Sequence, residues 1–292
     1  MKVLISIPAY NEEKTIGNII NETKEVMSKT KYDYEILVLD DGSTDGTVKV
    51  AKDLGVLVFS NSSNLGLAET FKKEIKKFLE LNADIMVHTD ADGQYYAKDI
   101  PKLIREIENG YDLVLGSRFI KKNKNMPTSK IFGNKAFAKV ISKMLRIKLT
   151  DTTTGFRAFT KEVAANIQFI NTFTYTQEQI IKAAKQNFRI KEIQVETRKT
   201  RESKLFKNPL EYAIKAWINL LRIYRDYEPL KFFGRIGMVL ILAGFVVGIW
   251  LFYLFITTGK VGHIPLTILT MLLIITGIQI ISFGFLADMK KT

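Results

Sequence analysis

The sequence predicts an α/β domain with a mostly parallel, doubly wound sheet, followed by a hairpin of two membrane-spanning helices. Two observations lead to this fold class. The first 200 residues alternate short apolar runs with segments of helical periodicity, and the C-terminal part contains two long runs without a charged residue. We therefore expect the α/β domain over residues 1–207, a helix at the membrane surface over 208–231, and the membrane hairpin over 232–292.

Five short runs in the domain predict buried strands, because their residues are apolar on both faces, as in the strands of parallel sheets. The runs are residues 3–8, 35–40, 56–60, 84–89 and 112–117. The segments between them predict helices, and Gly55 and Gly110 stand where two of these helices would end. In a sheet built this way, ligands bind beyond the carboxyl ends of the strands.

A basic segment follows the last of these runs. Between Arg118 and Thr150 the chain has ten Lys or Arg residues and no acidic residue, so this segment carries most of the net charge of +13. Within it, residues 129–146 predict a basic amphipathic helix. Its apolar positions are Phe132, Ala136, Val140 and Met144. The helix is either an ordinary solvated surface helix or one that contacts lipid or phosphate, and the absence of acids favours the second.

A second amphipathic helix is predicted within residues 208–231. Asn208 suits the N-cap and Pro209 the first helical position. The apolar face consists of Leu210, Ile214, Trp217, Leu221 and Tyr224. This helix either lies along the membrane or packs against the α/β domain, and we expect the former.

The two charge-free runs, about 236–256 and 264–286, have 21 and 23 residues. Each is long enough to cross the hydrocarbon core of a bilayer, which takes about 20 helical residues. Two buried helices of a soluble core are the alternative, but the length of the runs and their adjacency argue against it. We expect a membrane protein.

The basic residues beside these runs predict the orientation of the hairpin. Lys231 and Arg235 precede the first run, Lys290 and Lys291 follow the second, and the connection carries only Lys260. By the positive-inside rule, the α/β domain and both termini face the cytoplasm. The chain has no cysteine, which excludes disulfides and thiolate chemistry.

Four polar clusters close the predicted strands. They span residues 8–13, 40–47, 89–94 and 116–119. A single Asp-x-Asp is weak evidence for a site, but four clusters at successive strand ends of one sheet are strong evidence.

Oxygen ligands dominate these clusters. The glycine patterns of dinucleotide and P-loop cradles are absent, and His88 and His263 are poor metal candidates from their positions in a strand and in the hairpin loop. Asp90 and Asp92 would repel each other unless water or a cation compensates them. A hard cation, Mg²⁺ or Mn²⁺, held by these carboxylates with Gln94 nearby and by the diphosphate of a nucleotide, would do so.

The motifs IPAYNEE, LDDGSTDGT, TDADGQ, GSRF and TGFRAF, in this order over residues 1–205, resemble those of glycosyltransferase family 2. More narrowly, the chain is similar to the polyprenyl-phosphate sugar synthases, including dolichyl-phosphate mannose synthases and two-span bactoprenol-phosphate glycosyltransferases. The resemblance implies a GT-A type nucleotide-sugar fold. It is specific to the family and not to a donor sugar.

The resemblance also assigns roles to individual residues. Asp90, Asp92 and Gln94 would bind the metal and the donor diphosphate, and Arg118 would lie near the phosphates and the acceptor. The donor-binding residues would be Pro8, Tyr10, Glu12, Asp41, Asp90, Ala91, Asp92, Arg198 and Lys204. The acceptor phosphate would be held by Arg118, Lys130 and Ser203. Asp92 and Arg118 would be the catalytic residues.

The chain departs from the family pattern at two positions. Arg201 stands where family members have a glycine, which changes a loop over the donor if that position needs a positive φ. Lys130 stands where some relatives use a second arginine, so a bidentate contact becomes a point charge.

Structural roles compete with several functional ones. Pro8 and Tyr10 could simply turn the chain, and Asp41 or Asp45 could cap a helix. Arg157 is more often an ion-pair partner than a catalytic residue. Glu178 matches an acid that many relatives use as a base, but a phosphate acceptor has no proton to lose, so we expect it to organise a helix start or orient a basic side chain.

The expected function is metal-dependent, inverting transfer of one sugar from a GDP- or UDP-sugar to a polyprenyl phosphate, dolichyl or undecaprenyl, at the cytoplasmic face of a membrane. Two alternatives remain: a family 2 enzyme with another acceptor, and a non-catalytic membrane scaffold that binds nucleotide sugars. Nucleic acid is not an expected partner, since few aromatic residues interleave the basic segment. The resemblance also allows a homo-oligomer.

Overall fold

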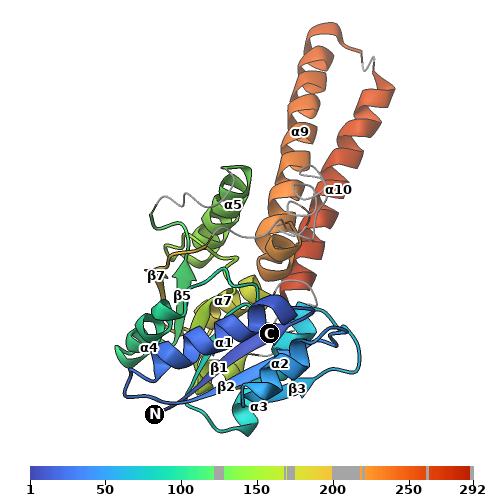
Figure 1. Ribbon diagram of the computed structural model, residues 1–292. Coiled ribbons are helices and arrows are strands. Elements are labelled where there is room, and N and C mark those ends of the chain that lie inside the picture. Colours follow the sequence, from blue (N-terminus) through green and yellow to red (C-terminus); the bar gives the residue numbers. More distant parts are fainter. Residues whose placement is uncertain are drawn as a thin grey trace. The chain divides into compact units, whose positions relative to one another are not determined.

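The computed structural model describes residues 1–121, 128–167, 169, 175–198, 218, 221–260 and 263–289 (Figure 1). These residues divide into two compact units, Met1–Leu205 and Phe206–Thr292.

The first unit is built on a seven-stranded sheet with the strand order β3-β2-β1-β4-β6-β5-β7. The strands are β1 (Lys2–Ala9), β2 (Asp33–Asp40), β3 (Leu57–Ser60), β4 (Ile85–His88), β5 (Leu113–Ser117), β6 (Arg157–Thr160) and β7 (Ile190–Gln194). Only β6 runs antiparallel, between β4 and β5. The mostly parallel sheet and its first five strands confirm the prediction. Strands β6 and β7 were not predicted.

Helices cover both faces of the sheet. They are α1 (Glu13–Met27), α2 (Thr47–Asp53), α3 (Leu67–Glu80), α4 (Ile100–Glu108), α5 (Thr128–Leu145), α6 (Lys161–Asn166) and α7 (Tyr175–Lys185), with the short 3-10 turn η1 (Ala97–Asp99) before α4. Helices α1 and α4, in front of the sheet in Figure 1, bury their apolar residues with Val3, Ile5 and Ile7 of β1. On the other face, Phe71 and Phe78 of α3 contact the ring of Phe159.

Helix α5 forms where it was predicted, but the apolar row named from the sequence is not its buried face. Phe137, Ala138 and Ile141 are buried, whereas Ala136 and Val140 are only partly buried. The sequence row was chosen by spacing alone. The structure selects the neighbouring stripe because that stripe faces the rest of the unit, where Asn134 also lies buried.

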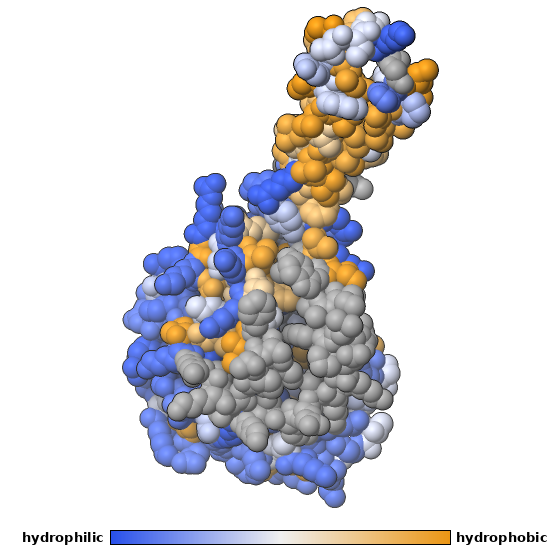
Figure 2. Space-filling view, turned by 90° about the horizontal axis from the view of Figure 1, so that it is seen from above, coloured by the Kyte–Doolittle hydropathy of each residue, from blue (hydrophilic) through white to orange (hydrophobic). Residues whose placement is uncertain are grey.

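The second unit contains α9 (Pro229–Thr258) and α10 (Ile264–Met289), both long and apolar enough to cross a membrane. Most of the hairpin surface is apolar in Figure 2. The helices approach closely at Gly237 and Gly277, since a Cβ on Gly237 would lie 2.5 Å from the carbonyl oxygen of Gly277. Small residues allow such backbone contacts between membrane helices. Half of the predicted helix at 208–231 lies outside the described residues, and within it residues 221–227 are helical.

Candidate functional site

The loop after β1 is tied to the loop after β2. The backbone N–H of Asp41 donates to the Ala9 carbonyl over 2.8 Å, and the N–H of Asn11 donates to Ser43 Oγ over 2.9 Å. Asn11 has a positive φ of 53°, which asparagine tolerates well. This turn follows Pro8 and leaves Tyr10 45% exposed, so its ring is accessible at the rim of the sheet.

Thr15 connects this first loop, at Glu12, to the Asp-x-Asp loop, at Ala91. The Thr15 hydroxyl lies 2.8 Å from Glu12 Oε2 and 2.8 Å from the carbonyl oxygen of Ala91. Two predicted donor-binding segments, separated by about 80 residues of chain, are thus brought together.

Asp41 has a clear structural role. Its carboxylate accepts hydrogen bonds from Asn61 Nδ2 at 2.8 Å and from the backbone N–H groups of Leu65 and Gly66, each at 2.9 Å. The side chain therefore shapes the loop after β3. Asp45 accepts from the backbone N–H of Thr47, the first residue of α2, at 3.0 Å. The N-cap residue is Gly46, so neither Asp41 nor Asp45 occupies the capping position that the alternative predicted.

The Asp-x-Asp-x-Gln loop leaves the end of β4. The backbone N–H of Gln94 donates to Asp92 Oδ1 over 2.8 Å, which shapes the turn. The Asp90 side chain is 29% exposed. It lies against Gly155, where an added Cβ would be 2.8 Å from Asp90 Oδ1. An added Cβ would have to displace the Asp90 carboxylate, so the glycine of TGFRAF lets the chain pass close beside it.

The residues of this loop fit Mg²⁺ or Mn²⁺ only as a partial ligand set. Asp90 and Asp92 supply carboxylate oxygens, but the described part of the chain has no group of three or more His, Cys, Asp or Glu arranged to hold a metal. A small hard cation typically keeps several waters and binds through one or two carboxylates plus substrate phosphates. Such a cation fits a site completed by a nucleotide diphosphate and water.

His88 lies behind the loop and is fully buried. Its Nδ1 is 3.2 Å from Glu74 Oε2, and its Nε2 is 3.1 Å from the Tyr175 hydroxyl. The buried ring thus packs in the core, and its Nε2 also lies 3.8 Å from Asp90 Oδ1. His263, in the second unit, stacks on Trp250.

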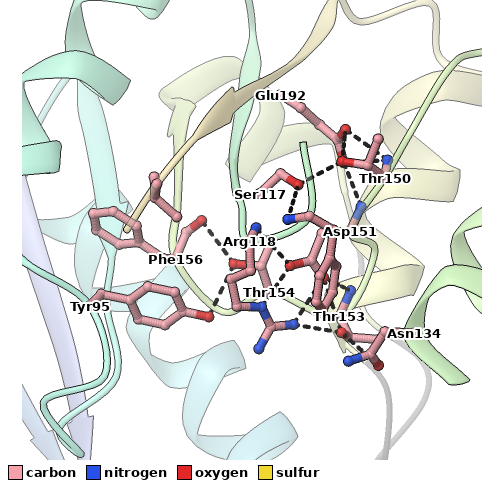
Figure 3. Close-up of polar contacts among 12 residues, drawn as sticks. Tyr95, Ser117, Arg118, Asn134, Thr150, Asp151, Thr153, Thr154, Phe156 and Glu192 are labelled. Atoms are coloured by element: carbon pink, nitrogen blue, oxygen red, sulfur yellow. Dashed lines mark hydrogen bonds and ion pairs between the residues drawn. The ribbon is translucent and has the colours of Figure 1, made fainter. Parts of the chain in front are cut away.

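Arg118 forms the most strongly paired group at the strand ends (Figure 3). It follows β5 and is only 8% exposed. Its Nε donates to Asp151 Oδ2 over 2.6 Å, and its Nη2 donates to Asp151 Oδ1 over 2.9 Å and to Thr153 Oγ1 over 2.8 Å. Nη1 makes no hydrogen bond with a described residue, so this nitrogen is left for a ligand.

The charge of Arg118 is secure. Burial by itself would lower its pKa, but coulombic interaction with Tyr95, Asp151 and Asp90 raises it above the ordinary value. The geometry also brings the β4 carboxylate and the β5 guanidinium to the same loop, since Arg118 contacts Thr153 and Asp90 lies against Gly155.

A second set of contacts holds Asp151 in place. The Glu192 carboxylate of β7 accepts from the backbone N–H groups of Thr150, at 2.7 Å, and Asp151, at 2.8 Å. Burial raises the pKa of Glu192. Asn134 of α5 lies 3.2 Å from the Thr153 hydroxyl. The sequence analysis missed Asp151, Thr153, Asn134 and Glu192. The only available signal for the first was an isolated acid at the end of a 33-residue segment without one.

Arg157 does not form the ion pair expected from its sequence. It is fully buried, and its guanidinium donates to the carbonyl oxygens of Thr154 and Thr176 and to Gln179 Oε1. None of the described residues forms a salt bridge with it. Burial lowers its pKa. Glu178 does pair with a basic side chain, Lys182 at 2.8 Å, in the first turn of α7, in agreement with its expected organising role.

Arg198 braces the Asp-x-Asp-x-Gln loop from behind. Its backbone N–H donates to the Gln94 carbonyl over 2.9 Å, and its Nη1 donates to the Gly93 carbonyl over 3.1 Å. Its Nη2 pairs with Glu22 at 2.6 Å. Ser203, Lys204 and Arg201 lie outside the described residues. Lys130 lies in α5, but its side chain is not among the described groups.

Residues 4–168 match the family described as Glycosyl transferase family 2, and residues 228–289 match the one described as GtrB C-terminal hairpin. The UDP-N-acetylglucosamine-dolichyl-phosphate N-acetylglucosaminyltransferase of Methanococcus voltae is 32% identical over 76% of this chain and 95% of its own. The dolichol-phosphate mannosyltransferase of Pyrococcus furiosus is 34% identical over 58% of this chain and 49% of its own.

A solved structure adds support for the fold. Glucosyl-3-phosphoglycerate synthase from Mycobacterium tuberculosis, in complex with Mn²⁺, UDP and glucosyl-3-phosphoglycerate, aligns with a TM-score of 0.59. The alignment covers 75% of this chain and 79% of that chain at 19% identity, so it shows a common fold.

Proposed function

We propose, since this chain belongs to glycosyltransferase family 2, that it transfers one sugar from a GDP- or UDP-sugar to a polyprenyl phosphate. The named relatives, which use dolichyl phosphate or dolichol phosphate, and the match to the C-terminal hairpin support this acceptor class. One observation carries the proposal. A buried arginine at the end of β5, whose Nη1 makes no hydrogen bond with a described residue, flanks the same loop, residues 153–155, as the Asp90 carboxylate at the end of β4.

The donor would bind over the ends of β1, β2 and β4. Tyr10, exposed at the rim, and Pro8 and Glu12 beside it would contact the nucleoside. The diphosphate would lie at Asp90 and Asp92. A divalent metal bound there, Mg²⁺ or Mn²⁺, would neutralise charge on the departing nucleoside diphosphate.

The acceptor phosphate would bind at Arg118. Two hydrogen bonds to Asp151 already hold its guanidinium in place. Binding of a phosphate at Nη1 would therefore cost little additional side-chain entropy. A phosphate oxygen of the lipid would form a bond to the anomeric carbon as the bond between that carbon and the donor diphosphate breaks. Attack from the opposite side inverts the anomeric configuration.

No protein base is required in this step. The acceptor is already an anion at neutral pH, and its attacking oxygen carries no proton. Glu178, the acid that could have been a base, is 2% exposed and paired with Lys182. Its expected contribution is to position α7.

The reaction would occur at the cytoplasmic face. The basic residues beside the two candidate spans favour a cytoplasmic α/β unit and cytoplasmic termini. Anchoring the enzyme in the bilayer that holds its acceptor raises the effective concentration of both partners.

A transfer assay tests the proposal. The full chain in detergent receives Mn²⁺ or Mg²⁺, dolichyl or undecaprenyl phosphate, and one of a panel of radiolabelled GDP- and UDP-sugars. We expect label in the organic phase from one donor and its loss on chelation. A parallel arm supplies 3-phosphoglycerate in place of the lipid. Label transferred only to the soluble acceptor, or to neither acceptor while the donor binds, would refute the proposal.

A further inference from the structure

A basic crevice runs along the outside of α5. It has a volume of about 600 Å³ and lies between the helix and residues 147–150. Four lysines line it, all with exposed side chains, and no acidic residue does. These four, called the crevice lysines below, are Lys135, Lys139, Lys143 and Lys148. The remaining lining is mainly apolar, from Phe119, Ala138, Ile147 and Leu149.

Hydrogen bonds and core packing fix the walls of the crevice. Ser142 Oγ lies 3.0 Å from the backbone N of Leu149 and 3.1 Å from its carbonyl oxygen, so residues 147–150 are held against α5. Phe137 and Ile141, both buried, fix the rotation of the helix. The lysines at 135, 139 and 143 recur every four residues and therefore form one row.

The crevice adjoins the Arg118 cluster through Phe119 and Thr150, but no crevice lysine forms a hydrogen bond or salt bridge with a described residue of that cluster. Asn134 is the residue of α5 that reaches that cluster, through Thr153. Lys135 is its immediate neighbour, about 100° further around the helix, and is exposed. The crevice lysines are therefore candidates for a phosphate other than the one that Arg118 would bind.

The charge of the crevice is uncompensated within the described protein. None of the crevice lysines forms a salt bridge with a described residue. Like charges four residues apart on a helix repel each other. An anion in the crevice would relieve this repulsion and gain from several ammonium groups at once.

We propose that the crevice binds the headgroup of an anionic phospholipid and so docks the α/β unit on an anionic bilayer surface. Three observations favour this occupant. Lysines supply point charges for a phosphate. The apolar lining residues can pack against the glycerol and first acyl carbons of a lipid, whereas free phosphate has no apolar part to contact them. The candidate spans of the same chain keep a bilayer within reach. Nucleic acid fits less well, because Phe119 is the sole aromatic lining residue.

The test compares lipid retention by two charge-matched variants of the full chain in detergent. The crevice variant carries Lys139→Glu and Lys143→Glu. The control variant carries Lys49→Glu and Lys52→Glu, which make the same charge change at two exposed positions of α2. Native mass spectrometry measures the apparent Kd for phosphatidylglycerol and for phosphatidylcholine. Nucleotide-sugar binding reports that each variant is folded.

We expect the crevice variant to bind phosphatidylglycerol roughly tenfold or more weakly than the unmodified chain, from the loss of several lysine contacts with anionic lipid. The control variant and the phosphatidylcholine values should change less than about twofold. Equal losses in the two variants, or no loss in the crevice variant, would overturn the proposal. Transfer of sugar to a lipid acceptor in detergent is not expected to change, so this result is separable from the proposed function.

Two further arms use the unmodified chain and do not depend on a variant folding. In nanodiscs, phosphatidylglycerol should protect the crevice lysines from amine acylation, relative to phosphatidylcholine, while Lys49 and Lys52 react equally in both. Absence of protection counts against the proposal. Inorganic phosphate or glycerol phosphate should not displace the lipid. Displacement at equal concentration would identify a soluble-anion site and refute the lipid assignment.

Discussion

The ends of β4 and β5 carry opposite charges that are compensated in opposite ways. Arg118, after β5, is 8% exposed and forms a bidentate ion pair with Asp151. Asp90, after β4, keeps a 29% exposed side chain and forms no salt bridge with a Lys or Arg among the described residues. The arginine is therefore preorganised by the protein. The carboxylate end stays partly exposed, and this difference is what we expect of a site that takes a cation with its substrate.

The largest effect is expected from disrupting the ion pair between Arg118 and Asp151 after β5. Arg118→Met leaves the Asp151 carboxylate buried without its partner, which should lower the free energy of unfolding by about 3–5 kcal/mol. Chemical denaturation of the full chain in detergent measures this. The double variant with Asp151→Leu is the control, because it removes both charges. It should recover much of the stability without restoring transfer. Equal instability of both variants would argue against the pair as the cause.

The next largest effect is expected from removing a carboxylate of the loop after β4. Asp92→Ala should reduce metal-dependent turnover by about 100-fold or more, through lost electrostatic stabilisation of the leaving diphosphate, with little change in stability. The transfer assay at several Mn²⁺ concentrations measures it. Asp53→Ala, at an exposed carboxylate that ends α2, should behave as the unmodified chain. Near-normal turnover of Asp92→Ala would reject the metal role.

A smaller effect should follow from moving Asp90 without removing it. Gly155→Ala introduces a Cβ 2.8 Å from Asp90 Oδ1, and the flexible carboxylate is the group that can shift. We expect about a tenfold loss of turnover, since small displacements of reacting groups are costly, and a higher metal concentration for half-maximal activity. Unfolding should change little. A large loss of stability with unchanged metal dependence would place the role of Gly155 in folding alone.

The smallest effect concerns Glu192, whose carboxylate holds the backbone of Asp151, the partner of Arg118. Burial raises the pKa of Glu192, so the folded state binds the carboxyl proton of Glu192 more tightly than the unfolded state does. Its contribution to stability is then complete below the unfolded value of about 4.5 and is lost as pH rises through the folded pKa. Glu192→Gln should flatten this decline in unfolding free energy above pH 4.5. An unchanged slope would exclude Glu192 as its source.

Much of the fold could be predicted because its signals are local. The first five strands are short apolar runs, and the two candidate spans are long ones, so neither depends on distant residues. Strand β7 was missed because its residues, IKEIQ, are all only partly buried, and β6 because its sequence, RAFT, has only two apolar residues. Antiparallel insertion of β6 between β4 and β5 depends on long-range pairing, which no local pattern encodes.

The sequence by itself determined the parallel α/β core, the acidic and basic motifs at the strand ends and the apolar hairpin, since each follows from periodicity or composition within a short window. Only the tertiary structure decided how charges are compensated. Arg118 meets Asp151, 33 residues away, and Asp151 meets Glu192, 41 residues further on. Burial and ion pairing depend on which distant side chains surround a group. The same kind of motif residue can therefore be a buried anchor, as Arg118 and Asp41 are, or a partly exposed carboxylate, as Asp90 is.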